Sequence, residues 1–133
     1  MKKIRVLIAI LGLDQHEVGA ISVSRALVGA GMEVIYVGRF NLPPMIVTVA
    51  LQESVEVIGI SCGSWEYLHY VPELMELLKE NELETRIIVG GPIITPGDER
   101  ALKEMGVAAV FGPSSTTEAV IEEVSKLVVD QER

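Results

Sequence analysis

The sequence is poor in residue types that would point to a cross-linked or strongly aromatic protein. Among 133 residues it has one cysteine and two histidines, and aromatic residues make up 5%. The single cysteine, Cys62, cannot form a disulfide within the chain, so a disulfide-stabilised scaffold is excluded. A reducing, cytoplasmic setting is therefore expected.

Positive charge and long apolar runs are also scarce. The chain has 11 Lys and Arg residues against 19 Asp and Glu residues, and its net charge of -8 opposes nucleic-acid phosphates and anionic lipid headgroups. Gly, Pro, Asp and Glu interrupt every apolar run, so none reaches the length of a membrane span. The N-terminus leads into a short strand rather than a signal peptide. We expect neither nucleic acid nor a membrane as a partner.

Apolar residues are nevertheless abundant. They make up 49% of the sequence, and the mean hydropathy of +0.39 is high for a soluble protein. Such values are typical of a parallel sheet that is covered by helices on both faces. The length suits one domain, residues 1–133, which can bury a core without disulfides.

Apolar, β-branched segments alternate with segments of helical spacing along the chain. The predicted strands are residues 4–11, 34–37, 55–61, 86–89 and 108–111, and the predicted helices are residues 18–30, 45–52, 71–79, 99–105 and 118–129. Five strand–helix units predict an α/β fold of the flavodoxin-like type, with a five-stranded parallel sheet in the order 2-1-3-4-5 and helices on both faces. Pro43 and Thr95 favour helix starts, and Gly31 and Gly106 favour helix ends.

The loop after the first strand carries the residues that best suit a metal ligand, because ligands of such sheets bind at the carboxyl ends of the strands. It reads GLDQHEVG over residues 12–19. The Asp14 carboxylate can reach the second ring nitrogen of His16, which strengthens an imidazole as a metal ligand. Asp14 and Glu17 also fit a capping box, in which His16 would be a solvated residue of the first helical turn. From these residues alone both interpretations stand.

Three other loops carry small or hydroxyl residues at strand ends. After the third strand, Ser61 could bond a flat ligand, although Ser64 could simply cap the next helix. After the fourth strand, the pair Gly90-Gly91 would leave a slot, although a plain turn explains it equally well. After the fifth strand, Ser115 and Glu118 fit an ordinary capping box.

Some further residues have mainly structural interpretations. Cys62 is expected to pack rather than to react, because no histidine beyond the two already in the chain could activate it. His69 is expected on the surface or at an interface. Trp65 would either cover a ligand or a partner, or simply pack.

Two other functions of this fold do not fit the loops. A phospho-accepting receiver domain needs an acidic pair after the first strand, an aspartate after the third and a lysine after the fifth. This chain has Leu11-Gly12, Ser61 and Phe111-Gly112 at those places. A flavodoxin needs a hydroxyl-rich phosphate loop after the first strand, where this chain reads GLDQ. Both functions are excluded.

The combination of GLDQHEVG, Ser61 and VGG (residues 89–91) at three strand ends resembles the cobalamin-binding domain of adenosylcobalamin-dependent mutases. The similarity extends over nearly the whole chain and includes GMEVIY (residues 31–36) and VPEL (residues 71–74). It is most similar to the small subunit of methylmalonyl-CoA mutase and of its acyl-CoA mutase relatives.

The resemblance implies that His16 is the lower axial ligand of cobalt and displaces the cofactor's own benzimidazole, with Asp14 bonded behind the imidazole. The displaced nucleotide tail would lie in a slot, with Ser61 bonding a ring nitrogen of the base. The implied cofactor-binding residues besides His16 are Asp14, Gln15, Gly19, Ser61, Gly63, Gly90, Gly91, Gly112 and Ser115. Adenosylcobalamin would carry the chemistry. The substrate site would belong to a separate barrel-type catalytic subunit that binds acyl-CoA, so this chain would be inactive alone.

Three positions depart from the family pattern. Ile10 stands where a lysine is usual, Gln15 where glycine is usual, and Gly63 where the pattern Ser-x-Leu has leucine. Without the lysine, Asp14 should keep its proton more readily and bind His16 less firmly. These departures are expected to spare cofactor binding more than mutase activity.

The leading hypothesis is the cobalamin-binding subunit of an acyl-CoA mutase. A corrinoid carrier for methyl transfer would use the same cobalt ligand, but such carriers usually have a helical cap before the first strand, which here begins at Ile4. A non-catalytic cobalamin sensor or storage module is also compatible with the departures.

Overall fold

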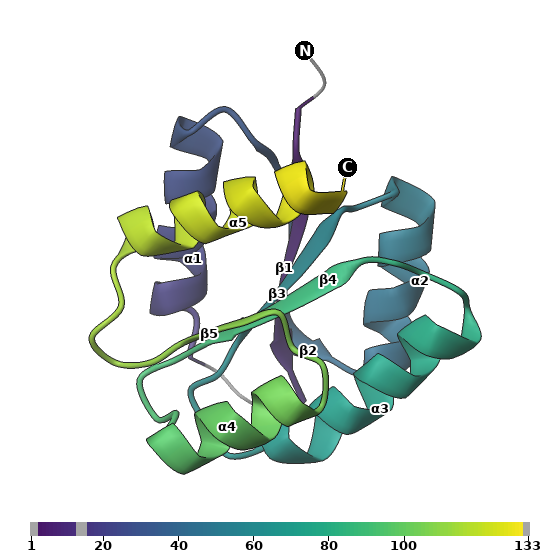
Figure 1. Cartoon of the computed structure of the whole chain (residues 1–133), viewed down its shortest axis with the longest axis vertical. Coiled ribbons are helices and arrows are strands. Elements are labelled where there is room, and N and C mark those ends of the chain that lie inside the picture. Colours follow the sequence, from purple (N-terminus) through teal and green to yellow (C-terminus); the bar gives the residue numbers. More distant parts are fainter. Residues whose placement is uncertain (1–2, 13–15, 132–133) are drawn as a thin grey trace.

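The computed structural model describes residues 3–12 and 16–131, in which one parallel sheet lies between two layers of helices (Figure 1). The strand order is β2-β1-β3-β4-β5, which confirms the predicted flavodoxin-like order. The elements are β1 (Arg5–Leu11), α1 (Val18–Gly29), β2 (Glu33–Asn41), α2 (Pro43–Glu53), β3 (Val57–Ser61), α3 (Tyr67–Glu80), β4 (Arg86–Gly90), α4 (Pro96–Glu104), β5 (Ala109–Phe111) and α5 (Thr117–Gln131).

Both faces of the sheet are buried, which explains the continuous apolar runs. Successive strand residues point to opposite faces, so Ile8 of β1 packs in the cluster beneath α1 and α5. Leu7 and Ala9 pack in the cluster beneath α2, α3 and α4. Figure 1 shows these two groups of helices on opposite sides of the sheet.

The pairing register aligns the carboxyl ends of four strands. Ile10 of β1 pairs with Ser61 of β3, Ser61 pairs with Gly90 of β4, and Gly90 pairs with Phe111 of β5. The residues that end these strands therefore lie in one row at the same edge of the sheet.

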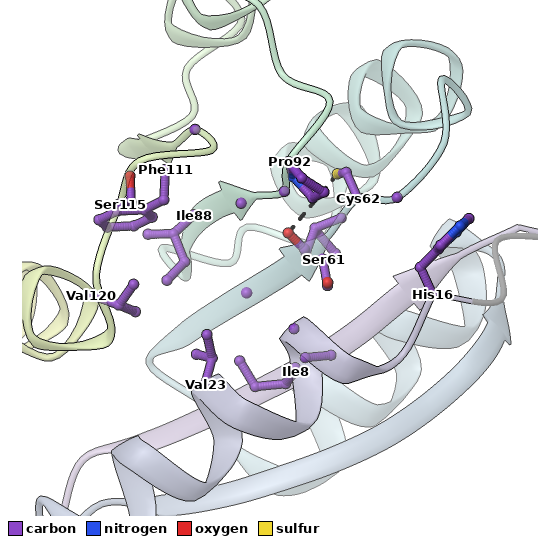
Figure 2. A pocket seen from close by; sticks show the side chains of 18 of the residues that line it. Ile8, His16, Val23, Ser61, Cys62, Ile88, Pro92, Phe111, Ser115 and Val120 are labelled. Carbon is purple, nitrogen blue, oxygen red and sulfur yellow. Dashed lines mark hydrogen bonds between the residues drawn. The ribbon is translucent and has the colours of Figure 1, made fainter.

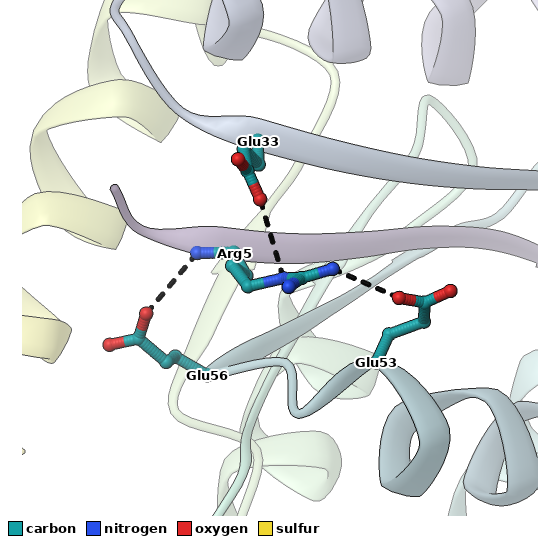
Figure 3. A network of polar contacts seen from close by, with 4 residues as sticks. All are labelled: Arg5, Glu33, Glu53 and Glu56. Atoms are coloured by element: carbon teal, nitrogen blue, oxygen red, sulfur yellow. Dashed lines mark hydrogen bonds and ion pairs between the residues drawn. The ribbon is translucent and has the colours of Figure 1, made fainter. Parts of the chain in front are cut away.

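A network of charged residues lies at the opposite edge of the sheet (Figure 3). The Arg5 guanidinium contacts Glu53 of α2 at 2.9 Å and Glu33 of β2 at 3.5 Å. The Arg5 amide donates to the Glu56 carboxylate at 3.2 Å. The one charged residue in the first apolar run thus joins the starts of β1 and β2 to the end of α2.

β2 is longer than the prediction, which ended it at Val37. Its pairing with β1 has register shifts between Ile8 and Ala9 and between Ala9 and Leu11. Gly38 and Phe40 have φ angles of 72° and 65°. These left-handed conformations interrupt the extended backbone, so side chains beyond Val37 no longer alternate regularly between the two faces. The alternation therefore stops at Val37, although the strand continues to Asn41.

α3 begins four residues earlier than predicted and contains Pro72 in its interior. The residues Tyr67, Val71, Leu74 and Leu78 are buried at helical spacing, so packing extends the helix back beyond the proline. The Tyr67 hydroxyl donates to the Asp98 carboxylate of α4 at 2.7 Å, which joins the starts of α3 and α4.

The expected helix boundaries at Pro43, Thr95, Gly31 and Gly106 are confirmed. Thr95 accepts a hydrogen bond from the Asp98 amide at 3.1 Å and completes a capping box.

Two caps that the sequence suggested, Ser64 as an alternative and Ser115 as the expected cap, are wrong. Ser64 does not cap α3, whose N-cap is Glu66 without a side-chain bond. α5 is capped by Thr116, which accepts from the Ala119 amide at 3.1 Å. Ser115 lies one residue before this cap, and its amide donates to the Gly112 carbonyl at 3.1 Å. It therefore belongs to the turn before the helix.

The bond between Tyr67 and Asp98 should make stability depend on pH. It lowers the pKa of the Asp98 carboxyl. An aspartate whose pKa is lowered by folding stabilises the fold above its unfolded pKa of about 4, and the contribution is lost as pH falls through the folded pKa. Tyr67→Phe should therefore lower the free energy of unfolding at neutral pH, and its difference from the wild type should shrink below about pH 4.

Urea unfolding at a series of pH values measures this difference. Tyr70→Phe, on the same helix, leaves the bond to Asp98 in place and serves as the control. A loss in Tyr67→Phe that is constant with pH would contradict the role of the Asp98 carboxylate.

Candidate functional site

A cavity of about 490 Å³ lies at the carboxyl edge of the sheet, between α1 and α5 (Figure 2). Its size is within the range of about 300–1,000 Å³ that small-molecule sites occupy. The predicted site residues that the structure describes all line it: His16, Gly19, Ser61, Gly63, Gly90, Gly91, Gly112 and Ser115. The other two, Asp14 and Gln15, lie outside the described residues.

The floor of the cavity is formed by β3 and β4. Gly59 pairs with Ile8 on one side and with Ile88 on the other, and a Cβ on Gly59 would lie 2.7 Å from the Cδ1 atom of Ile8. The missing side chain therefore leaves a hollow between two isoleucines. Ser61, two residues further along the same face, presents its hydroxyl to the hollow.

The walls are the first halves of α1 and α5. Val23 and Val120 face the cavity from the two helices (Figure 2). Gly19 precedes Val23 by four residues, so it lies on the same helix face, and a Cβ on Gly19 would meet nothing within 4 Å. In their second halves the helices share one buried cluster, which includes Leu27 and Val124. Ala20 and Val120 of the first halves belong to the same cluster, so the cavity lies beside this core, where Gly19 leaves space that a side chain would fill.

His16 is exposed at the mouth of the cavity. Its side chain lies directly against Gly63, where an added Cβ would overlap the Cβ and ring atoms of His16. On the same loop Gly12 has a φ angle of 60°, and a Cβ there would overlap the Glu66 carboxylate. The segment after β3 therefore packs closely against the segment that carries the imidazole.

The capping-box interpretation of Asp14 and Glu17 is wrong. That box would place His16 and Glu17 in the first helical turn, but both residues precede α1, whose N-cap is Glu17 without a side-chain cap bond. The Glu17 carboxylate instead accepts a hydrogen bond from the Tyr36 hydroxyl at 2.8 Å. A tertiary contact takes the carboxylate that a local cap would have used.

Gly90 and Gly91 have different roles. Beyond the strand ends, the Cys62 amide donates to the Gly90 carbonyl at 2.7 Å and the Gly91 amide to the Phe111 carbonyl at 3.0 Å. A Cβ on Gly91 would overlap the Cys62 carbonyl oxygen, whereas one on Gly90 would lie at ordinary distances of 3.5 and 3.6 Å from Phe111. Close backbone approach requires glycine at position 91, and a plain turn does not explain it.

The structure also places the residues with uncertain roles. Cys62 is buried in the core, as expected, and also lines the cavity. His69 is exposed, with its ring centroid 4.9 Å from that of Tyr70, and does not line the cavity. Trp65 is 72% exposed, so the packing interpretation is wrong for this chain. Ile10 is fully buried beneath α1 and α5, where a lysine would have to bury its charge.

Sequence reasoning found the loops of the cavity but missed its floor and walls. The period of two that relates Gly59 to Ser61, and the period of four that relates Gly19 to Val23, were signals for two of these residues. The missed lining residues are Ile8, Val18, Ala20, Val23, Gly59, Ile60, Cys62, Ile88, Pro92, Phe111, Thr116, Thr117 and Val120.

Within residues 3–12 and 16–131, no three His, Cys, Asp or Glu side chains gather as a protein metal cage requires. No helix in the same ranges is long and apolar enough to cross a membrane.

Gly91→Ala should destabilise the protein by about 1–3 kcal/mol, because the added methyl forces the Cys62 carbonyl to move. Gly90→Ala is the matched control and should change stability little. Urea unfolding measures both. Equal stabilities for the two variants would contradict the close approach of Gly91 to Cys62.

Comparison with known proteins adds to this geometry. The family described as B12 binding domain matches residues 4–122. The 2-hydroxyisobutanoyl-CoA mutase small subunit of Aquincola tertiaricarbonis is 38% identical over 125 residues, which cover 94% of this chain and 92% of that protein. The pivalyl-CoA mutase small subunit of Xanthobacter autotrophicus is 39% identical over 126 residues, with coverages of 95% and 84%.

A cobalamin-binding protein from Desulfitobacterium hafniense, known from its crystal structure, superposes with a TM-score of 0.81. The two sequences are 21% identical, and the alignment covers 95% of this chain and 60% of that one, so this likeness concerns the fold. The family match is independent of it and spans the segments that contain His16, Ser61 and Gly91. The chain belongs to the B12-binding domain family.

Proposed function

We propose that this chain is the cobalamin-binding subunit of an adenosylcobalamin-dependent acyl-CoA mutase, and that it binds the cofactor base-off with His16 as the lower ligand of cobalt. The observation that carries the proposal is the position of His16 at the mouth of a cavity whose floor presents Ser61. The names of the two relatives, both small subunits of CoA mutases of comparable length, support the class of enzyme.

The residues present fit the proposed ligand. The cavity is flanked by apolar side chains such as Ile8, Val23 and Val120, which suit an aromatic base. The hydroxyl of Ser61 could bond a ring nitrogen of that base. The open space beside Gly19 leaves room for the nucleotide tail. Asp14, which lies outside the described residues, is proposed to bond the second ring nitrogen of His16.

The division of labour follows from this fit. The cofactor, when bound, supplies a cobalt–carbon bond whose cleavage starts a radical rearrangement. The residues of this chain bind the cofactor and orient it, and we propose that an acyl-CoA substrate lies on a separate barrel-type catalytic subunit.

Three exposed apolar residues follow three strand ends around the cavity. They are Val18, Trp65 and Ile93, which are 81%, 72% and 39% exposed. Exposed apolar residues at this edge suit a partner that covers it.

A corrinoid carrier for methyl transfer would use the same imidazole and the same cavity, so the site geometry is compatible with both. The names of the relatives favour the mutase. A single buried cysteine and the net charge of -8 suit a cytoplasmic enzyme.

Histidine ligation is tested by electron paramagnetic resonance of the protein with cob(II)alamin. Labelling histidine with ¹⁵N should change the nitrogen coupling to cobalt, because the ligand atom would belong to His16 and not to benzimidazole. His16→Gln should abolish this coupling and weaken cobalamin binding at least about tenfold. His69→Gln is the control and should behave as the wild type. A coupling that the label leaves unchanged would exclude histidine as the ligand.

The position of the nucleotide tail is tested by filling the cavity from α1. Gly19→Leu should weaken cobalamin binding, because the new side chain occupies space that is open beside the helix. Binding of cobinamide, which lacks the nucleotide tail, should change much less. Gly19→Leu should not be less stable than the wild type, since glycine inside a helix costs about 0.5–1 kcal/mol relative to alanine.

Gly29→Leu on the same helix is the matched control, because a Cβ there also meets nothing within 4 Å and Gly29 does not line the cavity. Calorimetric titration with both corrinoids measures the affinities, and melting temperatures confirm folding. If Gly19→Leu bound cobalamin as tightly as Gly29→Leu, the tail would not lie between α1 and α5.

A further inference from the structure

Glu17 joins the start of α1 to β2, immediately beside the proposed cobalt ligand. It follows His16 in the chain and precedes Val18, the first residue of the helix. Its carboxylate accepts a hydrogen bond from the Tyr36 hydroxyl at 2.8 Å and lies 3.3 Å from the Arg39 Nε atom. Two side chains of β2 thus bind one carboxylate through its two oxygens.

The irregular end of β2 makes this double contact possible. In a regular strand Tyr36 and Arg39, three residues apart, would point to opposite faces of the sheet. An extra residue in β2 opposite the Ile8–Ala9 step shifts the register between them, so both side chains reach the α1 side. The departure from regular pairing therefore has a structural consequence at Glu17.

Asn41 fixes this end of β2. It is buried, and its amide group donates to the Gly38 carbonyl at 2.8 Å and to the Ile10 carbonyl at 3.3 Å. The Gly12 amide donates in turn to the Asn41 carbonyl at 2.8 Å. The bulged strand is thereby bonded to the point where the histidine segment leaves β1.

The Arg39 guanidinium is constrained from a second side, because it lies over the Phe40 ring at 5.1 Å from its centroid. Such cation–π contacts orient an arginine even at partly exposed sites. Partial burial, together with the bond to Glu17, raises the pKa of the Tyr36 hydroxyl to about 12, so this group is a donor at neutral pH.

On its other side the histidine segment meets the segment after β3. Gly63 lies against the His16 side chain, and the Glu66 carboxylate lies against Gly12. These contacts limit how far the imidazole can move toward β3. The Glu17 carbonyl accepts a hydrogen bond from the Ile21 amide of α1 at 2.9 Å, and its carboxylate is held from β2.

We propose that Tyr36 and Arg39 are positioning residues for His16, which set the place of its imidazole at the cavity by binding the adjacent Glu17 carboxylate. The inference rests on the proposed function, in which His16 binds cobalt. Neither residue would touch cobalt itself. Their loss should therefore change the fraction of protein with histidine bound to cobalt more than it changes stability, because partly exposed ion pairs contribute little to folding.

The first test uses the protein without cofactor. The chain has two histidines, so labelling with ¹³C and ¹⁵N histidine gives one reporter at His16 and an internal reference at His69. Arg39→Gln and Tyr36→Phe should shift or broaden the His16 ring signals and leave those of His69 in place. Lys103→Gln, which breaks an exposed pair with Glu99 of 3.2 Å on α4, is the matched control and should move neither signal.

The second test adds cob(II)alamin to the same variants. The fraction of the spectrum with histidine nitrogen coupling should fall in Arg39→Gln and further in the double variant with Tyr36→Phe. Cobalamin affinity should fall by up to about tenfold, at the lower end of the effects of residues behind a metal ligand. Melting temperatures should stay close to that of Lys103→Gln.

Unchanged His16 signals in both variants would overturn the inference, whatever cobalamin does. Shifted signals with an undiminished histidine-bound fraction would also overturn it, because the contact would then be structural only. If the wild type itself shows no histidine coupling, the proposed function fails, and the role of Tyr36 and Arg39 toward cobalt fails with it. The shifts without cofactor would then still report the contact with Glu17.

Discussion

The carboxyl edge of the sheet depends on two backbone hydrogen bonds that lie beyond the ends of β3 and β4. The Cys62 amide donates to the Gly90 carbonyl, and the Gly91 amide donates to the Phe111 carbonyl. They keep three strands aligned past the last paired residues, and they bring Gly91 so close to Cys62 that a side chain does not fit. Backbone hydrogen bonds therefore hold this edge of the sheet in place without side chains, which leaves space at the floor of the cavity for a ligand.

The element order, the strand order and the loops of the site could be predicted, because apolar alternation and strand-end residues are local features of the chain. The end of β2 could not, since Phe40 takes a positive φ and Asn41 secures it through bonds to another strand. The start of α3 was hidden for a similar reason. Pro72 favours a helix start nearby, but the burial of Tyr67 extends the helix past it.

The loop residues of the candidate site could be predicted, but its helix residues could not. Glycines and hydroxyl residues at strand ends stand out in a sequence, whereas Val23 and Val120 become part of a site only because α1 and α5 pack over the same face of the sheet. The choice between a cap and a metal ligand at His16 was likewise not a local question. The structure excludes only the cap, because Glu17 precedes α1 and its carboxylate pairs with Tyr36 and Arg39. Side chains of a distant strand cannot be located from the motif alone.

Function in this fold is decided at the strand ends, because the same sheet serves unrelated chemistries. Here the two helices over one face contribute both to the core and to the cavity. Their second halves, with Leu27 and Val124, close the core. Their first halves add Ala20 and Val120 to the same core and, with Gly19, enclose the cavity. Gly19, where an added Cβ would meet nothing within 4 Å, can therefore change with little cost to the core. Gly91 cannot, because its close approach to Cys62 serves both the floor of the cavity and the fold.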